Sequence, residues 1–397
     1  MSMSISIQGP EPASPHVESH PLSLATLTTF RSEFLAWCRA NSAEIAAHTI
    51  PHPDYETRVI AARSLQRLLF DAGWSRFGWP TWVGGFGGSA LHRGIVYEEL
   101  SRMGWHGPAI FEHLEIIAPT LLEFGDPDFV AERFPRFLDG TQSWVQGFSE
   151  PDAGSDLASL RTRGVIDDGC VVITGQKIWT SWAKWGHSCL ALVRTGSTED
   201  RHRGLTMVAV DLESPGVDVR PIQQANGTYE LAEVFFDEVR APIDQILGEI
   251  NGGWAVAMHL LAHERGTLAW FRHNHFRQRL AQGAEASTSV EDAALGAAIV
   301  QLAGLRATAG RQLAVDAAGG SLGPTAAFTK LLMTRLEQQL YDVLLRIHGA
   351  RMGFGVGNAD DQLLHQEYLF SRVVTIYGGS EQMQLMTLAN RVLRLGT

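Results

Sequence analysis

The spacing of apolar residues divides the chain into three parts. From residue 23 to about 140, apolar side chains recur every three or four positions, as at Leu27, Phe30, Phe34 and Trp37. This spacing places them on one face of a helix, because an α-helix has about 3.6 residues per turn. We therefore predict that the first third of the chain is helical.

Between about residues 143 and 239 the pattern changes to short runs rich in β-branched and aromatic residues, separated by turn sequences such as Asp167-Asp168-Gly169 and Asn226-Gly227. The predicted strands are Trp144–Phe148, Gly164–Ile166, Cys170–Thr174, Cys189–Arg194, Thr206–Asp211, Val217–Pro221 and Glu233–Asp237. Short strands at this spacing are typical of a small barrel or sandwich.

Helical periodicity returns at about residue 254. The predicted helices are Met258–Trp270, Ala293–Ala318, Thr325–His348 and Gln382–Arg394. This order differs from the alternating strands and helices of a doubly wound sheet. We predict an α+β fold, mostly α, with a flexible segment at 1–22, a helical domain at 23–142, a middle β domain at 143–245 and a helical bundle at 246–397.

Composition and charge narrow the function. The 397 residues are 45% hydrophobic and 19% charged, as in ordinary globular enzymes, and the net charge of −11 argues against nucleic acid as a partner. Three cysteines without a pairing or ligand motif argue against a disulfide scaffold or a zinc site. No signal-peptide core and no run of eighteen apolar residues is present, so we expect a cytoplasmic protein that spans no membrane.

Two short motifs carry candidate chemistry. The first, Ser149-Glu150-Pro151-Asp152-Ala153-Gly154-Ser155-Asp156, follows a predicted strand and turns sharply. Its Ser149 and Ser155 hydroxyls flank Gly154, and a glycine lets a planar ligand approach the backbone closely. The second, Gly175-Gln176-Lys177-Ile178-Trp179-Thr180-Ser181, places a tryptophan next to two hydroxyls at a strand end.

Together these motifs resemble the flavin-contacting strands of the acyl-CoA dehydrogenase family, which writes them Thr/Ser-Glu-Pro-x-Ala-Gly-Ser-Asp and Gly-x-Lys-x-Trp-x-Thr/Ser. The resemblance extends from about residue 23 to the end and implies a C-terminal four-helix bundle. It implies FAD as cofactor and an acyl-CoA thioester as substrate. It also implies an electron-transfer flavoprotein as acceptor and a homodimer, homotetramer or mixed tetramer. The FAD contacts that it implies here are Phe148, Ser149, Gly154, Ser155, Trp179, Thr180 and Ser181.

The same resemblance extends to the catalytic base. Many members carry the base directly after the tyrosine of a C-terminal signature, and this chain has Gly378 there, after Tyr377. A second group, with isovaleryl- and long-chain-type enzymes, carries its glutamate in a segment similar to Leu261-Ala262-His263-Glu264-Arg265. The resemblance therefore implies Glu264 as the base, in apolar surroundings that would partly desolvate it, with an ordinary solvated glutamate as the alternative. In relatives the N–H at the Gly378 position donates to the thioester oxygen.

Other parts of the signature are weaker. The resemblance places Tyr377, Gly379, Ser380 and Gln382 against the flavin or its phosphates, and Gly349 against the adenine part across a dimer interface. Leu385 replaces an arginine that relatives commonly carry at the end of this signature. We expect His263 and the glycine-rich loop 79–88 to be structural.

The helix predicted at 109–124 is expected to line the acyl pocket. It contains Phe111, Glu112, His113 and Glu115, which are more polar than plain alkyl chains require, so the acyl group is polar, cyclic or bulky, or these side chains face solvent.

The prediction is flavin-dependent α,β-desaturation of an acyl-CoA, an oxidation of a CH–CH bond. A non-catalytic partner subunit that binds little flavin, and a relative that acts on a carrier-protein-bound or non-thioester substrate, remain as alternatives.

Overall fold

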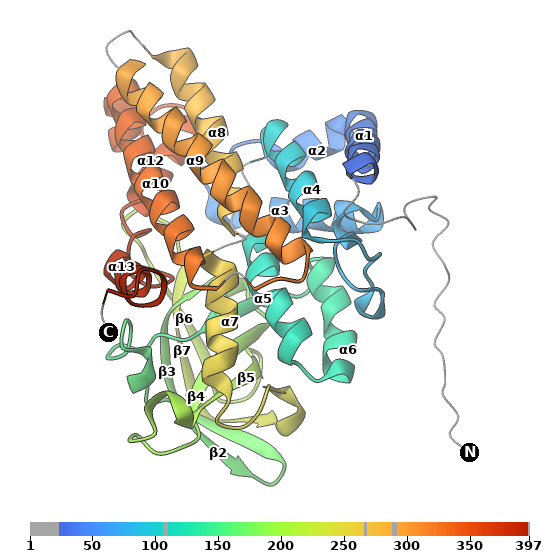
Figure 1. The fold of residues 1–397 in the computed structure, drawn as a ribbon, viewed down its shortest axis with the longest axis vertical. Helices are drawn as coiled ribbons and strands as arrows, with labels where there is room; N and C mark the ends of the chain where they lie inside the picture. Colours follow the sequence, from blue (N-terminus) through green and yellow to red (C-terminus); the bar gives the residue numbers. More distant parts are fainter. Residues whose placement is uncertain (1–23, 106–109, 266–267, 288–291, 322, 396–397) are drawn as a thin grey trace, which may run out of the picture.

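The computed structural model of the chain describes residues 24–105, 110–265, 268–287, 292–321 and 323–395. The fold is the predicted one: helices, then a β domain, then helices again (Figure 1). The segment 1–22, which we expected to be flexible, lies outside the described residues.

The N-terminal region is helical, as its periodicity predicts. Phe30 and Phe34, one turn apart, are both buried, and their rings pack edge-on against Trp74. Because these contacts join α1 to the turn after α3, the apolar face of the first helix closes the core of this region. The helices are α1 (Leu24–Ala40), α2 (Ser42–Thr49), α3 (Tyr55–Asp71), α4 (Ala90–Arg102), α5 (Ile110–Phe124) and α6 (Pro127–Leu138).

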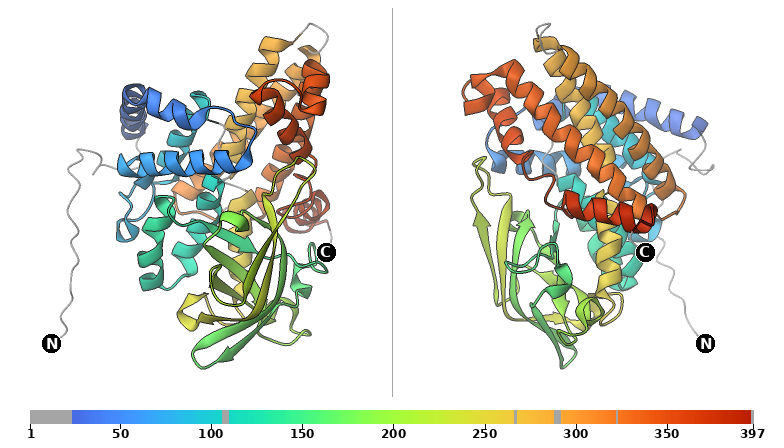
Figure 2. Two further views of the ribbon diagram at one scale, coloured as in Figure 1. Left: turned by 180° about the vertical axis from the view of Figure 1, so that it is seen from behind. Right: turned by 60° about the vertical axis from the view of Figure 1, so that its left-hand side comes forward.

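The β domain is one hydrogen-bonded sheet with the order β6-β7-β3-β2-β4-β5-β8, and β1 pairs with β4 in parallel. Every residue of β4 is buried, as is all of β5 except its last residue. Helices α5 and α7 stand beside this part of the domain (Figures 1 and 2). The strands are β1 (Trp144–Gly147), β2 (Arg163–Asp167), β3 (Cys170–Ser181), β4 (Ser188–Arg194), β5 (Leu205–Asp211), β6 (Val217–Ile222), β7 (Leu231–Pro242) and β8 (Ile246–Leu247).

The C-terminal region has its own apolar core, which includes Phe276, Leu302, Leu340 and Leu364 from four helices. The helices are α7 (Gly253–Arg265), α8 (Leu268–Ala286), α9 (Asp292–Ala317), α10 (Ala326–His348), α11 (Ala350–Phe354), α12 (Ala359–Phe370) and α13 (Glu381–Thr387).

Two helix predictions in this region need correction. The predicted helix Met258–Trp270 is two helices, α7 and α8. Residues 266 and 267, which lie between them, are not among the described residues. The helix predicted at Gln382–Arg394 is α-helical only to Thr387, and a π-helical turn follows from Leu388 to Val392. Apolar residues recur on both sides of each break, so their spacing alone does not show where one helix ends.

Helix α9 is apolar enough, over Ala293–Ala317, to cross a membrane by length and composition alone. Core helices of soluble proteins meet the same criterion. Here Leu302 and Leu305 of α9 are buried in the bundle core, whereas Val300 is exposed.

Candidate active site

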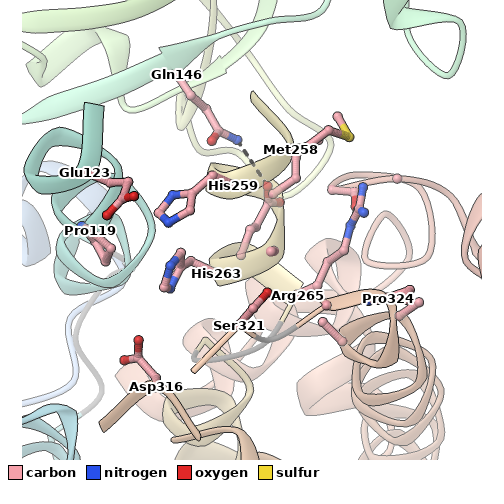
Figure 3. A pocket seen from close by; sticks show the side chains of 18 of the residues that line it. Pro119, Glu123, Gln146, Met258, His259, His263, Arg265, Asp316, Ser321 and Pro324 are labelled. Atoms are coloured by element: carbon pink, nitrogen blue, oxygen red, sulfur yellow. Dashed lines mark hydrogen bonds between the residues drawn. The ribbon is translucent and has the colours of Figure 1, made fainter. Parts of the chain in front are cut away.

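A cavity of about 1070 Å³ lies where the three regions meet (Figure 3). Its walls come from β1 and the first motif, from α5 and α7, and from the connection between α9 and α10. Backbone at Gly378 and Gly379 closes another side. The cavity thus brings together residues from across the chain.

The first motif is held in place by a buried carboxylate. Glu150 accepts hydrogen bonds from the backbone N–H groups of Arg161 (2.6 Å) and Thr162 (2.8 Å), and its Oε1 lies 2.8 Å from Lys177 Nζ. Lys177 is fully buried and also donates to the Phe148 carbonyl at 3.2 Å. Because Lys177 belongs to the second motif, this ion pair joins the two motifs.

A backbone hydrogen bond of 2.9 Å from Ile178 N–H to the Ser149 carbonyl joins them again. Directly beyond it the pairing of β3 with β7 shifts register, and Trp179 adopts φ = 61°. This left-handed conformation costs a non-glycine residue about 1–2 kcal/mol. It leaves the Trp179 side chain 54% exposed at the strand end, with an aromatic surface available to a ligand.

The first motif fits a planar cofactor. Phe148, Ser149, Gly154 and Ser155 line the cavity. A Cβ added at Gly154 would meet nothing within 4 Å, so open space adjoins the backbone there. Neither serine hydroxyl has a hydrogen-bond partner among the described residues, and both can donate to a ligand.

Glu264 reaches the cavity from the last turn of α7. The helix is anchored on β5 at its first residue, Gly253, where a Cβ would lie 2.5 Å from the backbone nitrogen of Met207. From this start α7 brings Glu264 to the cavity wall, 4% exposed, with Oε2 3.5 Å from Gln146 Nε2.

Gly378 makes room for that carboxylate. Its φ is +63°, and a Cβ built on it would collide with Glu264 Oε1. The Glu264 carboxylate therefore occupies the space into which a side chain at position 378 would project. In a chain with a glutamate at 378, both acids could not hold these positions.

The turn at Gly378 is fixed from both sides. Arg265 Nε donates to the Gly378 carbonyl at 2.9 Å, and Gln384 Nε2 donates to the Gly379 carbonyl at 2.9 Å. Among the described residues, none accepts a hydrogen bond from the Gly378 N–H. An N–H on the cavity wall without an acceptor is available to a ligand oxygen.

Two cations lie near Glu264. Arg265 follows it in the helix, and Lys330 Nζ lies 3.4 Å from the same added Cβ of Gly378. Lys330 is buried, with its ammonium 3.9 Å from the centre of the Tyr377 ring and without a hydrogen-bond acceptor among the described residues. Burial lowers the pKa of Lys330 to about 8, although Glu264 and Glu337 favour its charged form.

The opposite side of α7 carries different chemistry. Figure 3 shows His259 and His263 on the side of the helix that faces Glu123 and Asp316, away from Arg265. The two imidazole centres are 4.7 Å apart, and Asp316 Oδ2 lies 3.5 Å from Arg93 Nη2. We name Arg93, Glu123, His259, His263 and Asp316 the polar end of the cavity.

Comparisons with known proteins agree with this geometry. Three family models match: the acyl-CoA dehydrogenase N-terminal domain at residues 28–141, the middle domain at 146–239 and the C-terminal domain at 251–393. The acyl-CoA dehydrogenase IpdE1 of Mycobacterium tuberculosis is 36% identical over 386 residues, 92% of this chain and 97% of that protein. The chain belongs to the acyl-CoA dehydrogenase family.

A second relative, the acyl-CoA dehydrogenase IpdE1 of Mycolicibacterium smegmatis, is 35% identical over 87% of this chain and 90% of its own. Among solved structures, "Tcur3481-Tcur3483 steroid ACAD" matches with a TM-score of 0.77 and 25% identity, over 96% of this chain and 99% of that one. Acyl-CoA dehydrogenases are FAD-dependent oxidoreductases that act on CH–CH bonds.

The structure brings only part of the predicted acyl-CoA dehydrogenase site to the cavity wall. Glu264, Gly378, Gly379 and the first motif line it. Thr180 is buried, and its hydroxyl has no hydrogen-bond partner among the described residues. The predicted residues that do not line this cavity are Trp179, Thr180, Ser181, Gly349, Tyr377, Ser380 and Gln382, and their contacts with FAD stay predictions.

One expectation about the pocket needs correction. Helix α5 lines the cavity through Pro119, Leu122 and Glu123. His113 instead donates to the Trp144 carbonyl at 2.8 Å, and Glu115 pairs with Arg93 at 2.8 Å. These two side chains therefore face neither the cavity nor solvent, while the side chains of 111 and 112 lie outside the description.

Two further expectations, that His263 and the glycine-rich loop are structural, stay untested, although both reach the cavity. His263 lines the cavity, as do Trp79, Pro80 and Gly88 of the glycine-rich loop. Arg93 lies over the Trp79 ring, 3.9 Å from its centre, so the loop also contacts a charged residue of the cavity wall.

Sequence reasoning missed Lys330 and Asp316. Both lie on helices that the periodicity predicted, but nothing in the spacing shows which helix face meets α7. The sequence did contain one signal for them: a lysine or aspartate within an otherwise apolar helix face. Such charges are seldom buried without a partner, so their position indicates a site.

Proposed function

We propose that this chain desaturates an acyl-CoA thioester between its α and β carbons, with Glu264 as the base. The observation that carries the proposal is the position of the Glu264 carboxylate. It projects into the space next to the positive-φ Gly378, in a cavity that the first motif also lines. Family membership supports the reaction class.

The chain's own residues would act as follows. The Glu264 carboxylate takes the α-proton as the C–H bond breaks, and the Gly378 N–H donates to the thioester oxygen as negative charge develops there. Ser149, Gly154 and Ser155 hold one side of the cofactor. When bound, FAD supplies the oxidant that accepts the hydride from the β-carbon.

An electron-transfer flavoprotein is the proposed acceptor of the electrons, as in relatives. We also propose an oligomer, a homodimer, homotetramer or mixed tetramer. Two matched structures support a mixed assembly by their titles: "Tcur3481-Tcur3483 steroid ACAD" and the ChsE4-ChsE5 complex from Mycobacterium tuberculosis. Contacts across an interface would also give a role to Gly349, which lies outside this cavity.

The test is rapid mixing of the oxidised holoenzyme with acyl-CoAs in the absence of oxygen, with flavin bleaching as the readout. Glu264→Gln should keep the flavin spectrum but slow its bleaching by about 10²-fold or more, since a positioned base contributes about 10²–10⁴-fold. Glu249→Gln, on the exposed loop before α7, is the matched control and should bleach at the parental rate. Parental bleaching in Glu264→Gln would disprove the base.

A second candidate function is a partner subunit that binds little flavin. It is favoured by the position of Tyr377, Ser380 and Gln382 away from the cavity wall. A purified chain without visible flavin absorbance, which gains activity only when a second subunit is added, would support this role.

A further inference from the structure

The polar end of the cavity has features that a pocket for plain alkyl chains would not need. His263 is 7% exposed and Arg93 is 8% exposed, and both line the cavity with Glu123, His259 and Asp316. Covering such groups with an alkyl chain would remove their water without replacing its hydrogen bonds, which is unfavourable. An acyl group that supplies hydrogen bonds avoids this cost.

Charge decides which polar group fits. The guanidinium of Arg93 is already engaged by Glu115 at 2.8 Å, by the Gly78 carbonyl at 2.6 Å and by Asp316 at 3.5 Å. Glu123 adds another carboxylate at the wall and has no ion-pair partner among the described residues. No positive charge at the polar end is therefore left over for a carboxylate on the ligand.

The histidines are kept neutral. Burial lowers the pKa of His263 to about 3 and also lowers the pKa of His259. A neutral imidazole has one donor and one acceptor nitrogen, so it can serve either a hydroxyl or a ketone. His259 Nδ1 lies 3.0 Å from Thr120 Oγ1, which leaves its Nε2 for another partner.

The polar end also lies at a defined position relative to the base. His259 precedes Glu264 by five residues on α7, or about 7.5 Å along the helix axis at about 1.5 Å per residue. A group bound at His259 is several carbon–carbon bonds from the α-carbon. It is therefore remote from the bond that reacts.

From these observations we infer that the polar end binds an uncharged oxygen function, a hydroxyl or a ketone, carried by the acyl group several carbons from the thioester. This inference rests on the proposed function and adds the class of acyl group to it. His259 and His263 are its hydrogen-bonding residues, and Glu123 and Asp316 exclude a second carboxylate. These residues determine specificity and take no part in the proton transfer.

The experiment compares three acyl-CoAs of equal length at each of several lengths, from hexanoyl to decanoyl. One has a terminal hydroxyl, one a methyl in its place, and one a carboxylate. We expect the holoenzyme to prefer the hydroxylated substrate to the methyl analogue by roughly tenfold or more in kcat/KM at the best length, as one or two neutral hydrogen bonds would give. The carboxylated substrate should be the poorest, because like charges repel.

Variants locate the effect. His263→Leu and His259→Leu should each bring the hydroxyl-to-methyl ratio close to one, whereas His52→Leu, on the exposed loop between α2 and α3, should keep it. Asp316→Asn preserves the shape of the side chain and removes a negative charge, so it should raise kcat/KM for the carboxylated substrate several-fold. Calorimetric binding of the same substrates to Glu264→Gln measures the preference in Kd without turnover, and remains usable if a histidine variant does not fold.

The outcomes separate the inference from the function on which it rests. If no acyl-CoA bleaches the flavin, the proposed function fails. Bleaching by all three substrates without preference for the hydroxyl overturns the inference alone, as does preference for the carboxylate. An equal loss with every substrate in the histidine variants would mean that the polar end contacts the CoA part common to all of them, and would also overturn the inference.

Discussion

The two sides of α7 differ in how the protein treats their charges. On one side Glu264 has a space made for it by Gly378 and lies near two cations, Arg265 and Lys330. On the other side His259 and His263 are held neutral by burial. One short helix thus presents an ionisable base to one part of the cavity and uncharged hydrogen-bonding groups to the other.

This difference follows from what covers each side. The Glu264 side faces backbone, the Gly378 turn and the first motif, whose N–H and hydroxyl groups can bind anionic or planar groups. The histidine side faces α5 and the end of α9, where the Arg93 charge is already matched. Neighbouring residues on a helix point about 100° apart, so a single step along the sequence separates the two environments.

The largest effect is expected from Gly378→Ala, which changes the side of α7 that carries Glu264. Its Cβ would collide with Glu264 Oε1, and φ = +63° costs a non-glycine residue about 1–2 kcal/mol. Displacing the base by about 1 Å can cost about 10²-fold, so flavin bleaching by acyl-CoA should slow on the order of 10²-fold.

Gly227→Ala is the matched control, because Gly227 has φ = +79° but nothing within 4 Å of an added Cβ. This variant should lose some stability and keep the parental bleaching rate. If Gly378→Ala bleaches as fast as Gly227→Ala, Glu264 does not depend on the space beside Gly378.

A smaller effect is expected on the histidine side when the pH falls. A pKa of about 3 for His263 in the folded state lies below the usual value of 6.5, so the unfolded chain binds more protons and stability falls with pH below about 6.5. Each such histidine contributes up to about 1.4 kcal/mol per pH unit. His113, His273 and His275, whose pKa values burial lowers to about 4, add to this loss.

Denaturant unfolding at pH 7, 6 and 5 measures the slope. Below pH 6 the free energy of unfolding should fall less steeply with pH in His263→Phe than in the parent. The two slopes should differ by about 1 kcal/mol per pH unit. An unchanged slope would show that His263 is protonated in the folded protein, and the neutral imidazole in the polar end would have to be abandoned.

The smallest effect is expected from Lys330→Met. Near pH 8 the parent should lose the Lys330 charge, because burial brings its pKa to about 8. A positive charge near Glu264 opposes proton uptake by the carboxylate, so the bleaching rate should rise a few-fold between pH 7 and 9. Flavin bleaching by Lys330→Met should be fast at every pH and show no rise between pH 7 and 9. Lys184→Met, which removes an exposed ion pair with Glu56, should keep the rise. A rise that persists in Lys330→Met must come from another group.

Periodicity in the sequence predicted the fold for a physical reason, whereas Glu264 was named only through the resemblance to acyl-CoA dehydrogenases. Period-two and period-3.6 patterns report which faces are buried, and the two strand-end motifs are local. The glycine at 378 was also visible in the sequence, and the structure shows Glu264 Oε1 in the space beside it.

The polar end could not be predicted in the same way. Glu115 and Glu123 both belong to α5, but one turns inward to Arg93 and the other lies at the cavity. Which of two glutamates on a helix reaches a cavity depends on the elements packed around it, and spacing along one helix does not contain that information. Lys330 went unnoticed for the same reason.

The two contacts that join the first and second motifs have a practical consequence. The Glu150–Lys177 ion pair and the bond from Ile178 N–H to the Ser149 carbonyl clamp the two motifs together at the base of the β2–β3 hairpin. The hairpin tip at Asp168 and Gly169, where both residues have positive φ, lies beyond this clamp. Extra residues inserted there, such as an affinity tag or a surface anchor, would lengthen the ribbon while the clamp keeps both motifs in register.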